Sequence, residues 1–461
     1  MPTIKVVDIT PRALSGDTSL DSEPNLAVNP ENPNQLVATA FTPDPMGGPL
    51  APVYVSADGG DTWVLRSVVP GNADPGGTGD ISVGFAPQGG TLYTGILNGE
   101  DGDLQVLRAA DVTSDAPMEV LVDRAAVHNP DQPWVVAGGT VVNGSGRDVV
   151  YVGNNDGDHQ PHSATVDVSA DARHGHGAFR SVQVDQRAHR VFDGPPVRIA
   201  LHPDGTVYTA FESWSDFSGL VVTFDVVVTR DDKGALVASP FQDLRDSDDG
   251  VAGQRVAAGR RVRFNVKAAT LGQERTGADL SIAVDPTDSG TVWIAWCDGT
   301  GGTVPTDYVL HVRRSTDRGQ TWAPARADLV NAKNPALAIN ADGLVGLVYQ
   351  QLAHDQWTTA LELTADGGAT AEAHVLHQAP GDVPKAPPGA LPYLGDYIRM
   401  VAVGRDFYGI FAGNNTPDRA NFPVGVTYQR NADFTTHQLL DLDGVSRVPP
   451  SLDPFFFHRA A

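Results

Sequence analysis

Short apolar strands alternate with polar turns along the whole chain, and one two-strand pattern returns seven times. In each copy a short apolar stretch, often ending in Asn-Pro, Asp-Pro or a Gly turn, precedes a strand rich in β-branched and aromatic residues. The copies are NLAVNPENPNQLVATAF from Asn25, DISVGFAPQGGTLYTGIL from Asp80, PWVVAGGTVVNGSGRDVVYVG from Pro133, VRIALHPDGTVYTAF from Val197, LSIAVDPTDSGTVWIAW from Leu280, ALAINADGLVGLVYQ from Ala336 and YIRMVAVGRDFYGIFAG from Tyr397. Two further strand-like stretches follow each pair, and no convincing helical period is present, so each repeat is expected to hold four strands.

Four antiparallel strands per repeat predict an all-β fold, a single seven-bladed β-propeller. The expected blades cover residues about 20–78, 79–130, 131–190, 191–277, 278–332, 333–394 and 395–445 of the single domain. Six blades with an extra sheet are the alternative, because the third repeat has the longest connecting loops. The stretch from about Asp231 to Arg275 is interpreted as an excursion inserted into the fourth blade.

Both ends of the chain are expected to close the ring. The N-terminal stretch TIKVVDIT has the pattern of a strand, and the C-terminal stretch SLDPFFFHRAA contains three consecutive phenylalanines, Phe455 to Phe457. Left outside a sheet, these rings would form an exposed apolar run. We therefore expect the two terminal segments to clamp the ends of the propeller.

The charge balance disfavours several classes of ligand. The 461 residues include 32 Lys and Arg against 56 Asp and Glu, a net charge of −24. This excess repels phosphate backbones and anionic lipid, so neither nucleic-acid binding nor membrane docking is expected. One cysteine, Cys297, excludes a disulfide within the chain and any multi-thiolate metal site. With no apolar run of membrane-spanning length and no secretory signal visible, we expect a cytoplasmic protein or one exported by a non-classical route.

A turn motif recurs between the third and fourth strands of some repeats. SADGGDTW (Ser56–Trp63) and STDRGQTW (Ser315–Trp322) match Ser-x-Asp-x-Gly-x-Thr-Trp in full, and the weaker copy TADGGATA (Thr364–Ala371) keeps Asp366, Gly368 and Thr370 and loses the Trp. The spacing predicts a tight turn in which Ser and Asp oxygens accept backbone N–H groups and Gly supplies a positive φ. This motif resembles the Asp-box, or BNR repeat, of the sialidase superfamily, and SEPNLAVNP, DQPWVVA and LGDYIRMVA resemble blade starts of bacterial exo-sialidase-like proteins.

The resemblance implies a propeller that acts on or recognises glycans, as a glycoside hydrolase or polysaccharide lyase. The resemblance does not extend to classical sialidases, because no Arg-Ile-Pro precedes the first Asp-box and Arg198-Ile199 is followed by Ala200. The alternative is a non-catalytic scaffold that binds a carbohydrate or a protein.

The site is expected where the first strand of each blade starts, at the mouth of the central channel. Packed carboxylates raise one another's pKa, so one can serve as a general acid beside an ionised partner. Aromatic faces suit stacking on sugar rings, and arginines suit the carboxylate of a uronate or sialate. The candidate acid, base, nucleophile and hydroxyl groups are Glu23, Asp80, Asp131, Glu212, Asp396 and Tyr397, and the candidate substrate-binding residues are Trp134, Arg198, Trp214 and Arg399.

One short acidic stretch suits a hard cation. In NNDGD, Asn154, Asp156 and Asp158 supply alternating oxygens around a Gly, which suits Ca²⁺, although no Glu stands at the twelfth position of an EF-hand loop. No other cofactor is expected.

Overall fold

The computed structural model describes residues 3–41, 51–70, 79–98, 103–124, 130–142, 145–156, 163–174, 178–187, 191–264, 271, 274–301, 305–381 and 394–461. The first sheet holds β2 (Ser22–Val28), β3 (Leu36–Phe41), β4 (Ala51–Ser56) and β5 (Val64–Val69), and the second β6 (Ile81–Phe85), β7 (Leu92–Asn98), β8 (Asp103–Ala109) and β9 (Glu119–Arg124). The third holds β10 (Trp134–Val142), β11 (Ser145–Asp156), β12 (Ser163–Ser169) and β13 (Phe179–Gln183), and the fourth β14 (Val197–Leu201), β15 (Val207–Ser218), β16 (Val221–Asp231) and β17 (Gln254–Arg263).

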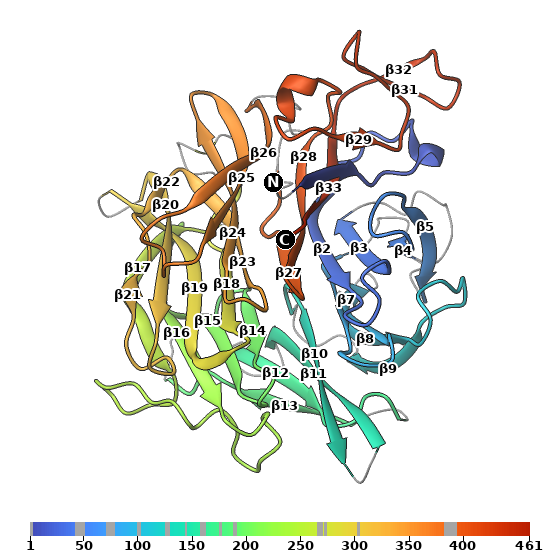
Figure 1. Cartoon of the computed structure of the whole chain (residues 1–461). Helices are drawn as coiled ribbons and strands as arrows, with labels where there is room; N and C mark the ends of the chain where they lie inside the picture. Colours follow the sequence, from blue (N-terminus) through green and yellow to red (C-terminus); the bar gives the residue numbers. More distant parts are fainter. Residues whose placement is uncertain are drawn as a thin grey trace.

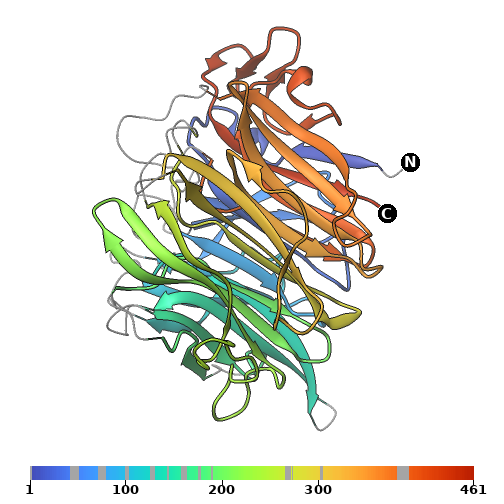
Figure 2. The same cartoon turned by 90° about the vertical axis from the view of Figure 1, so that its left-hand side faces the viewer.

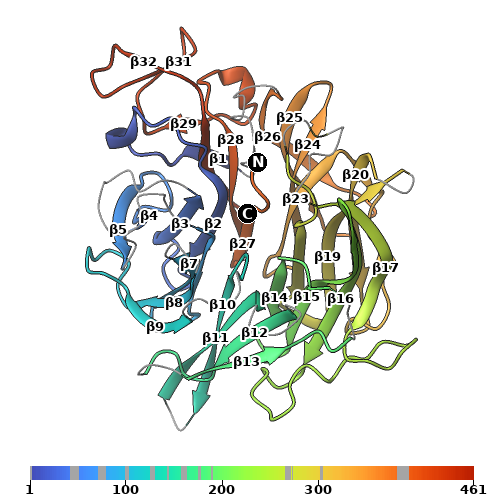
Figure 3. The same ribbon diagram turned by 180° about the vertical axis from the view of Figure 1, so that it is seen from behind.

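Three more sheets complete the set. The fifth holds β18 (Leu280–Asp285), β19 (Asp288–Thr300), β20 (Asp307–Ser315) and β21 (Ala323–Pro324), with β22 (Leu329–Val330) also on β20, and the sixth β23 (Ala332–Ile339), β24 (Val345–Ala353), β25 (Gln356–Thr364) and β26 (Glu372–Pro380). The seventh holds β27 (Arg399–Val403), β28 (Asp406–Asn414), β33 (Leu452–Arg459), β1 (Ile4–Asp8) and β29 (Thr427–Tyr428). A small outlying sheet of β30 (Ala432–Asp433), β31 (Gln438–Leu440) and β32 (Arg447–Val448) projects beyond the ring (Figure 3).

The seven larger sheets surround a central axis (Figure 1). Their innermost strands contact one another in a closed ring, from β2 through β6, β10, β14, β18 and β23 to β27 and back to β2. The helical content of the described residues is limited to two 3₁₀ turns, η1 (Arg12–Leu14) and η2 (Arg419–Asn421), and no helix there is long and apolar enough to cross a membrane. The predicted all-β propeller is confirmed.

The seventh sheet joins the two ends of the chain. β33 lies between β28 and β1, and Phe456 stands opposite Val7 in the register with β1. The side chains of Phe455, Phe456 and Phe457 are fully buried. Figure 2 shows the two termini next to each other on one side of the molecule. The terminal strands therefore supply the outer half of this sheet.

Stacking of sheet on sheet explains why some strands are buried along their whole length. All seven residues of β12 and all eight of β23 are buried, because each sheet is covered on two sides. The close approach requires glycine at Gly153, where an added Cβ would lie 2.3 Å from the carbonyl oxygen of Val197 in the next sheet. The size of the side chains, as well as their apolar character, therefore determines how closely neighbouring sheets pack.

The turn motifs form the predicted hydrogen bonds. Between β4 and β5, Ser56 Oγ accepts the N–H of Gly60 at 2.9 Å and Asp58 Oδ1 accepts that of Thr62 at 2.9 Å, while the indole of Trp63 donates to the Gly60 carbonyl. The turn from Ser315 repeats these contacts. These turns stabilise hairpins on the face opposite the strand starts.

The fourth sheet differs from its sequence interpretation. The stretch expected to be an inserted excursion, Asp231 to Arg275, contains the outer strand β17, and residues 232–253 connect β16 to it. This strand was missed because Arg-rich QRVAAGRRVR lacks the apolar alternation of the other strands.

Candidate functional site

Three carboxyl groups converge at the mouth of the channel. Glu23 lies at the start of β2, and Asp80 and Asp131 immediately precede β6 and β10. The carboxyl groups of Glu23 and Asp131 are each within hydrogen-bonding reach of that of Asp80. Glu23 and Asp80 are buried, whereas Asp131 is partly exposed.

The start of the seventh sheet completes this acidic cluster, which we define as Glu23, Asp80, Asp131 and Asp396. The hydroxyl of Tyr397 donates to Asp80 Oδ1 at 2.9 Å. The backbone N–H of Asp396 donates to Glu23 Oε1 at 3.1 Å. Arg275 forms an ion pair with Asp396 and a longer one, at 3.3 Å, with Glu23. Five of the six residues predicted as catalytic are therefore brought together.

Electrostatics favour the protonated form of two members of the cluster. Burial, and then the negative charge of Asp80, raises the pKa of Glu23 and of Asp131 well above the usual range. Arg275 opposes this effect on both residues. Burial and the charge of Asp80 also raise the pKa of Tyr397, which keeps its hydroxyl proton in place for donation. The raised pKa is the direction of shift that a general acid requires.

A strained backbone conformation recurs where the inner strands begin. Glu23, Gln132 and Asn334 have positive φ values of 54°, 46° and 52°, and each is followed by proline. Non-glycine residues in this region cost about 1–3 kcal/mol and tend to gather at functional sites. Here the conformation occurs at the same point of three sheets.

A fully buried ion pair supports the cluster from beneath. Lys333 Nζ lies 3.1 Å from Glu274 Oε2 and donates to the carbonyls of Arg275 at 3.0 Å and Gly395 at 2.9 Å. Glu274 Oε1 accepts the backbone N–H of Leu394. Lys333 therefore ties together the segments that carry Arg275 and Asp396.

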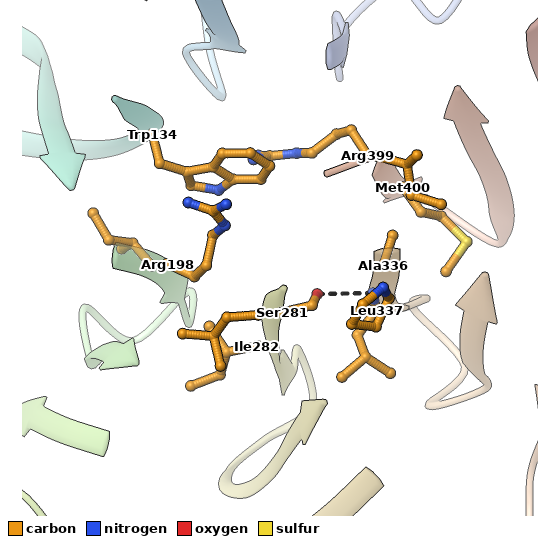
Figure 4. A pocket seen from close by; sticks show the side chains of 12 residues that line it. Trp134, Arg198, Ser281, Ile282, Ala336, Leu337, Arg399 and Met400 are labelled. Carbon is orange, nitrogen blue, oxygen red and sulfur yellow. Dashed lines mark hydrogen bonds between the residues drawn. The ribbon is translucent and has the colours of Figure 1, made fainter. Parts of the chain in front are cut away.

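An aromatic and cationic stack lies deeper in the channel. Trp134 packs edge to face on Tyr397, with ring centroids 5.6 Å apart. The guanidinium carbons of Arg198 and Arg399 lie 4.1 and 4.4 Å from the Trp134 ring centroid. Figure 4 shows the two arginines reaching the indole from different strands. Neither arginine belongs to the acidic cluster itself.

Two further predicted site residues lie outside both the cluster and the stack on Trp134. Trp214 is fully buried and packs on Phe192, Phe217 and Phe264, so its face is unavailable for stacking on a sugar at the mouth. Glu212, also fully buried, accepts the indole N–H of Trp214 at 3.3 Å. Both residues lie inside β15, which continues beyond the point where its end was expected.

The predicted calcium ligands also occupy a strand. Asn154 and Asp156 are buried in β11, and Asp158 lies outside the described residues. The amide of Asn154 donates to Asp167 at 3.1 Å, and Asp156 forms an ion pair with Arg124 at 2.8 Å. The described part of the chain contains no group of three or more His, Cys, Asp or Glu residues arranged to hold a metal ion. The calcium site remains a prediction.

Sequence reasoning missed the residues that support the cluster. Arg275 and Glu274 lie in the stretch interpreted as an excursion, and Lys333 lies at the start of β23, ahead of Ala336, where the sequence repeat was taken to begin. A usable signal was present: the Xaa-Pro pairs at Glu23, Gln132 and Asn334 mark equivalent strand starts.

Comparisons with known proteins support the fold alone. No family model and no curated protein matches the chain. A PL25 polysaccharide lyase, an ulvan lyase solved bound to -[GlcA(1-4)Rha3S]-, is 11% identical with a TM-score of 0.52, covering 86% of this chain and 92% of its own. The α-L-arabinanase of Penicillium chrysogenum, complexed with arabinobiose, is 13% identical with a TM-score of 0.44, covering 98% of both chains. The GH93 α-L-arabinofuranosidase of Fusarium graminearum, also with arabinobiose, is 13% identical with a TM-score of 0.43, covering 80% of this chain and 97% of its own.

Proposed function

We propose that the chain is a glycan-active propeller that hydrolyses a glycosidic bond at the mouth of its channel. The observation that carries the proposal is the convergence of Glu23, Asp80 and Asp131, with the Tyr397 hydroxyl on Asp80. Glycoside hydrolysis needs two carboxyl groups roughly 5–10 Å apart, one of them protonated. The fold shared with the ulvan lyase agrees with action on a glycan.

Each group has a role that follows from its surroundings. Asp131, partly exposed and with a raised pKa, is placed to protonate the departing oxygen of the glycosidic bond. Asp80, oriented by the Tyr397 hydroxyl, acts as nucleophile or as base towards water. Trp134 and Tyr397 are both buried and in edge-to-face contact, so they support these groups from within the protein rather than offer a face for stacking on a sugar.

Hydrolysis is favoured over a lyase reaction by the charges at the mouth. A lyase removes a proton next to a uronate carboxylate and gains from a cation that neutralises that carboxylate. Among the described residues in contact with the acidic cluster, the guanidinium of Arg275 is already paired with Asp396 and Glu23. The net charge of −24 also disfavours an anionic polymer. The sialidase-like activity that the turn motifs suggested is tested in the same experiment.

The test is a panel of aryl glycosides and polysaccharides, neutral and anionic, with sialosides included. We expect turnover of at least one member, lost by 10²-fold or more in Asp80→Asn and Asp131→Asn. Asp342→Asn, a half-exposed carboxylate paired with Arg405, is the matched control and should keep wild-type turnover. Wild-type protein that binds a panel member by calorimetry without turnover contradicts hydrolysis.

The second candidate is a non-catalytic glycan- or protein-binding module. It is favoured by the internal pairing of the cluster, in which Tyr397 bonds to Asp80 and Arg275 to Asp396. Binding that survives Asp80→Asn with no turnover in either protein would identify this role.

A further inference from the structure

A cavity of about 70 Å³ lies within the channel, lined by the inner strands of the third to seventh sheets. Its polar lining consists of Arg198, Arg399 and Ser281, together with the indole of Trp134 (Figure 4). The remaining lining is apolar, including Leu280, Ile282 and Met400, and no carboxylate is among the described residues around it. A volume of this size accommodates a few water-sized groups.

The two arginines bring unused hydrogen-bond donors to this cavity. Arg198 is 2% exposed and donates from Nη2 to Gln132, but its Nε and Nη1 have no hydrogen-bond partner among the described residues. Nη1 of Arg399 is likewise buried and without a partner in the described part of the chain. Ser281 adds a hydroxyl: its oxygen accepts the N–H of Leu337 at 3.0 Å, which leaves its proton available.

The charge of Arg399 is poorly compensated. Arg198 has negative groups nearby, because Asp80, Glu212 and Asp131 all act on it. Burial lowers the pKa of Arg399 to about 9, and the charged group that acts on it is Arg198, which is also positive. Both side chains stay protonated at neutral pH. Stacking on Trp134 compensates part of the burial, but among the described residues no negative group compensates the buried charge of Arg399.

We propose that this cavity binds a small inorganic anion, chloride being of suitable size and charge, between the guanidinium groups of Arg198 and Arg399. The anion accepts the unused N–H groups and the Ser281 hydroxyl. It neutralises the cationic pair, so the two side chains keep Trp134 in place beneath Tyr397. The inference does not depend on the hydrolytic function proposed for the acidic cluster.

The test compares thermal unfolding in sodium chloride and in sodium gluconate at equal ionic strength. We expect millimolar chloride to raise the melting temperature of the wild type by about 1–3 °C, because an anion that binds only the folded state stabilises it. Arg399→Met removes one of the two charges and should abolish the chloride dependence. Arg405→Met, which removes an arginine that is mostly exposed, is the matched control and should retain it.

Crystals soaked in bromide provide a readout that does not depend on a variant. An anomalous peak between the Arg198 and Arg399 guanidinium groups supports the proposal, even where Arg399→Met fails to fold. Equal melting temperatures in both salts, together with no such peak, overturn it. A shift produced by acetate or glucuronate but not by halide also overturns it and identifies the cavity as a pocket for a sugar carboxylate.

Discussion

Tyr397 and Asp80, 317 residues apart in the chain, are joined by a hydrogen bond of 2.9 Å between the phenolic hydroxyl and a carboxylate oxygen. The bond connects the start of the seventh sheet with that of the second, across the first. It places a proton donor on the carboxylate that Glu23 and Asp131 share. This contact is therefore both part of the proposed active site and a link across the ring.

Removing the hydroxyl should impair turnover more than stability. We expect Tyr397→Phe to lower kcat/KM on the best glycoside of the panel by about 10–100-fold, since Asp80 loses the donor that orients it. The loss of one hydrogen bond costs about 1 kcal/mol in stability. Tyr151→Phe removes a comparable bond, to the carbonyl of Gly234 at 2.9 Å, and is the control. Equal kcat/KM in the two variants would contradict a role for Tyr397 in the reaction.

The buried ion pair beneath the cluster should matter for stability and for the geometry of the mouth. Lys333→Met leaves Glu274 buried without its cation, so we expect the free energy of unfolding to fall by about 3–5 kcal/mol. It also frees the carbonyls of Arg275 and Gly395. Denaturant unfolding measures the loss. The double variant Lys333→Met, Glu274→Leu should recover most of it, and a double variant as unstable as the single one would argue against an uncompensated charge as the cause.

Much of this architecture could be predicted because its signal is local and repeated. The seven apolar strand pairs indicate the ring, and the rule that first strands start at the mouth identified Glu23, Asp80, Asp131, Asp396 and Tyr397. That rule needs only strand order, which the repeat supplies.

Side chains near strand ends were harder to place. The rule failed for Trp214 and Glu212 because β15 runs on to Ser218 and packs these residues under aromatic neighbours. Arg275 and Lys333 could not be predicted, since their partners are set by loops whose path depends on packing between sheets. Their contacts cross 121 and 59 residues respectively.

The stability of the fold should decrease as pH rises through the weakly acidic to neutral range. Burial raises the pKa of Glu274 to about 7 and that of Glu212 well above its usual range. A raised pKa means that the folded state binds more protons than the unfolded state, so stability is greatest below the unfolded value and falls as pH rises through the folded one. We expect a lower melting temperature at pH 8 than at pH 5.5.

Glu212→Gln tests the source of this dependence. The amide cannot ionise and its oxygen can still accept the Trp214 indole proton, so the difference between pH 5.5 and pH 8 should shrink. Asp366→Asn is the control, because hydrogen bonds from Thr370 and Thr364 hold the pKa of that exposed carboxylate at about 2, below the range scanned. If Glu212→Gln shows the full wild-type difference in melting temperature between pH 5.5 and pH 8, Glu212 does not contribute to the pH dependence as expected.

Closure of the ring depends on the C-terminal strand, and Phe456 is its best probe. The ring is fully buried, packs edge to face on Trp63 with centroids 5.4 Å apart, and lies where a Cβ on Gly60 would come within 2.2 Å of it. We expect Phe456→Ala to lower the free energy of unfolding by about 3–5 kcal/mol, through lost burial and the cavity left behind.

The matched control for Phe456 is Val445→Ala, a side chain that is 78% exposed, which should change stability by less than about 0.5 kcal/mol. Deleting residues 450–461 removes β33 from between β28 and β1, so it should lower the melting temperature by more than Phe456→Ala does. Calorimetry of the three variants measures both effects. If the truncated protein has the same melting temperature as the wild type, the ring closes without pairing between the ends of the chain.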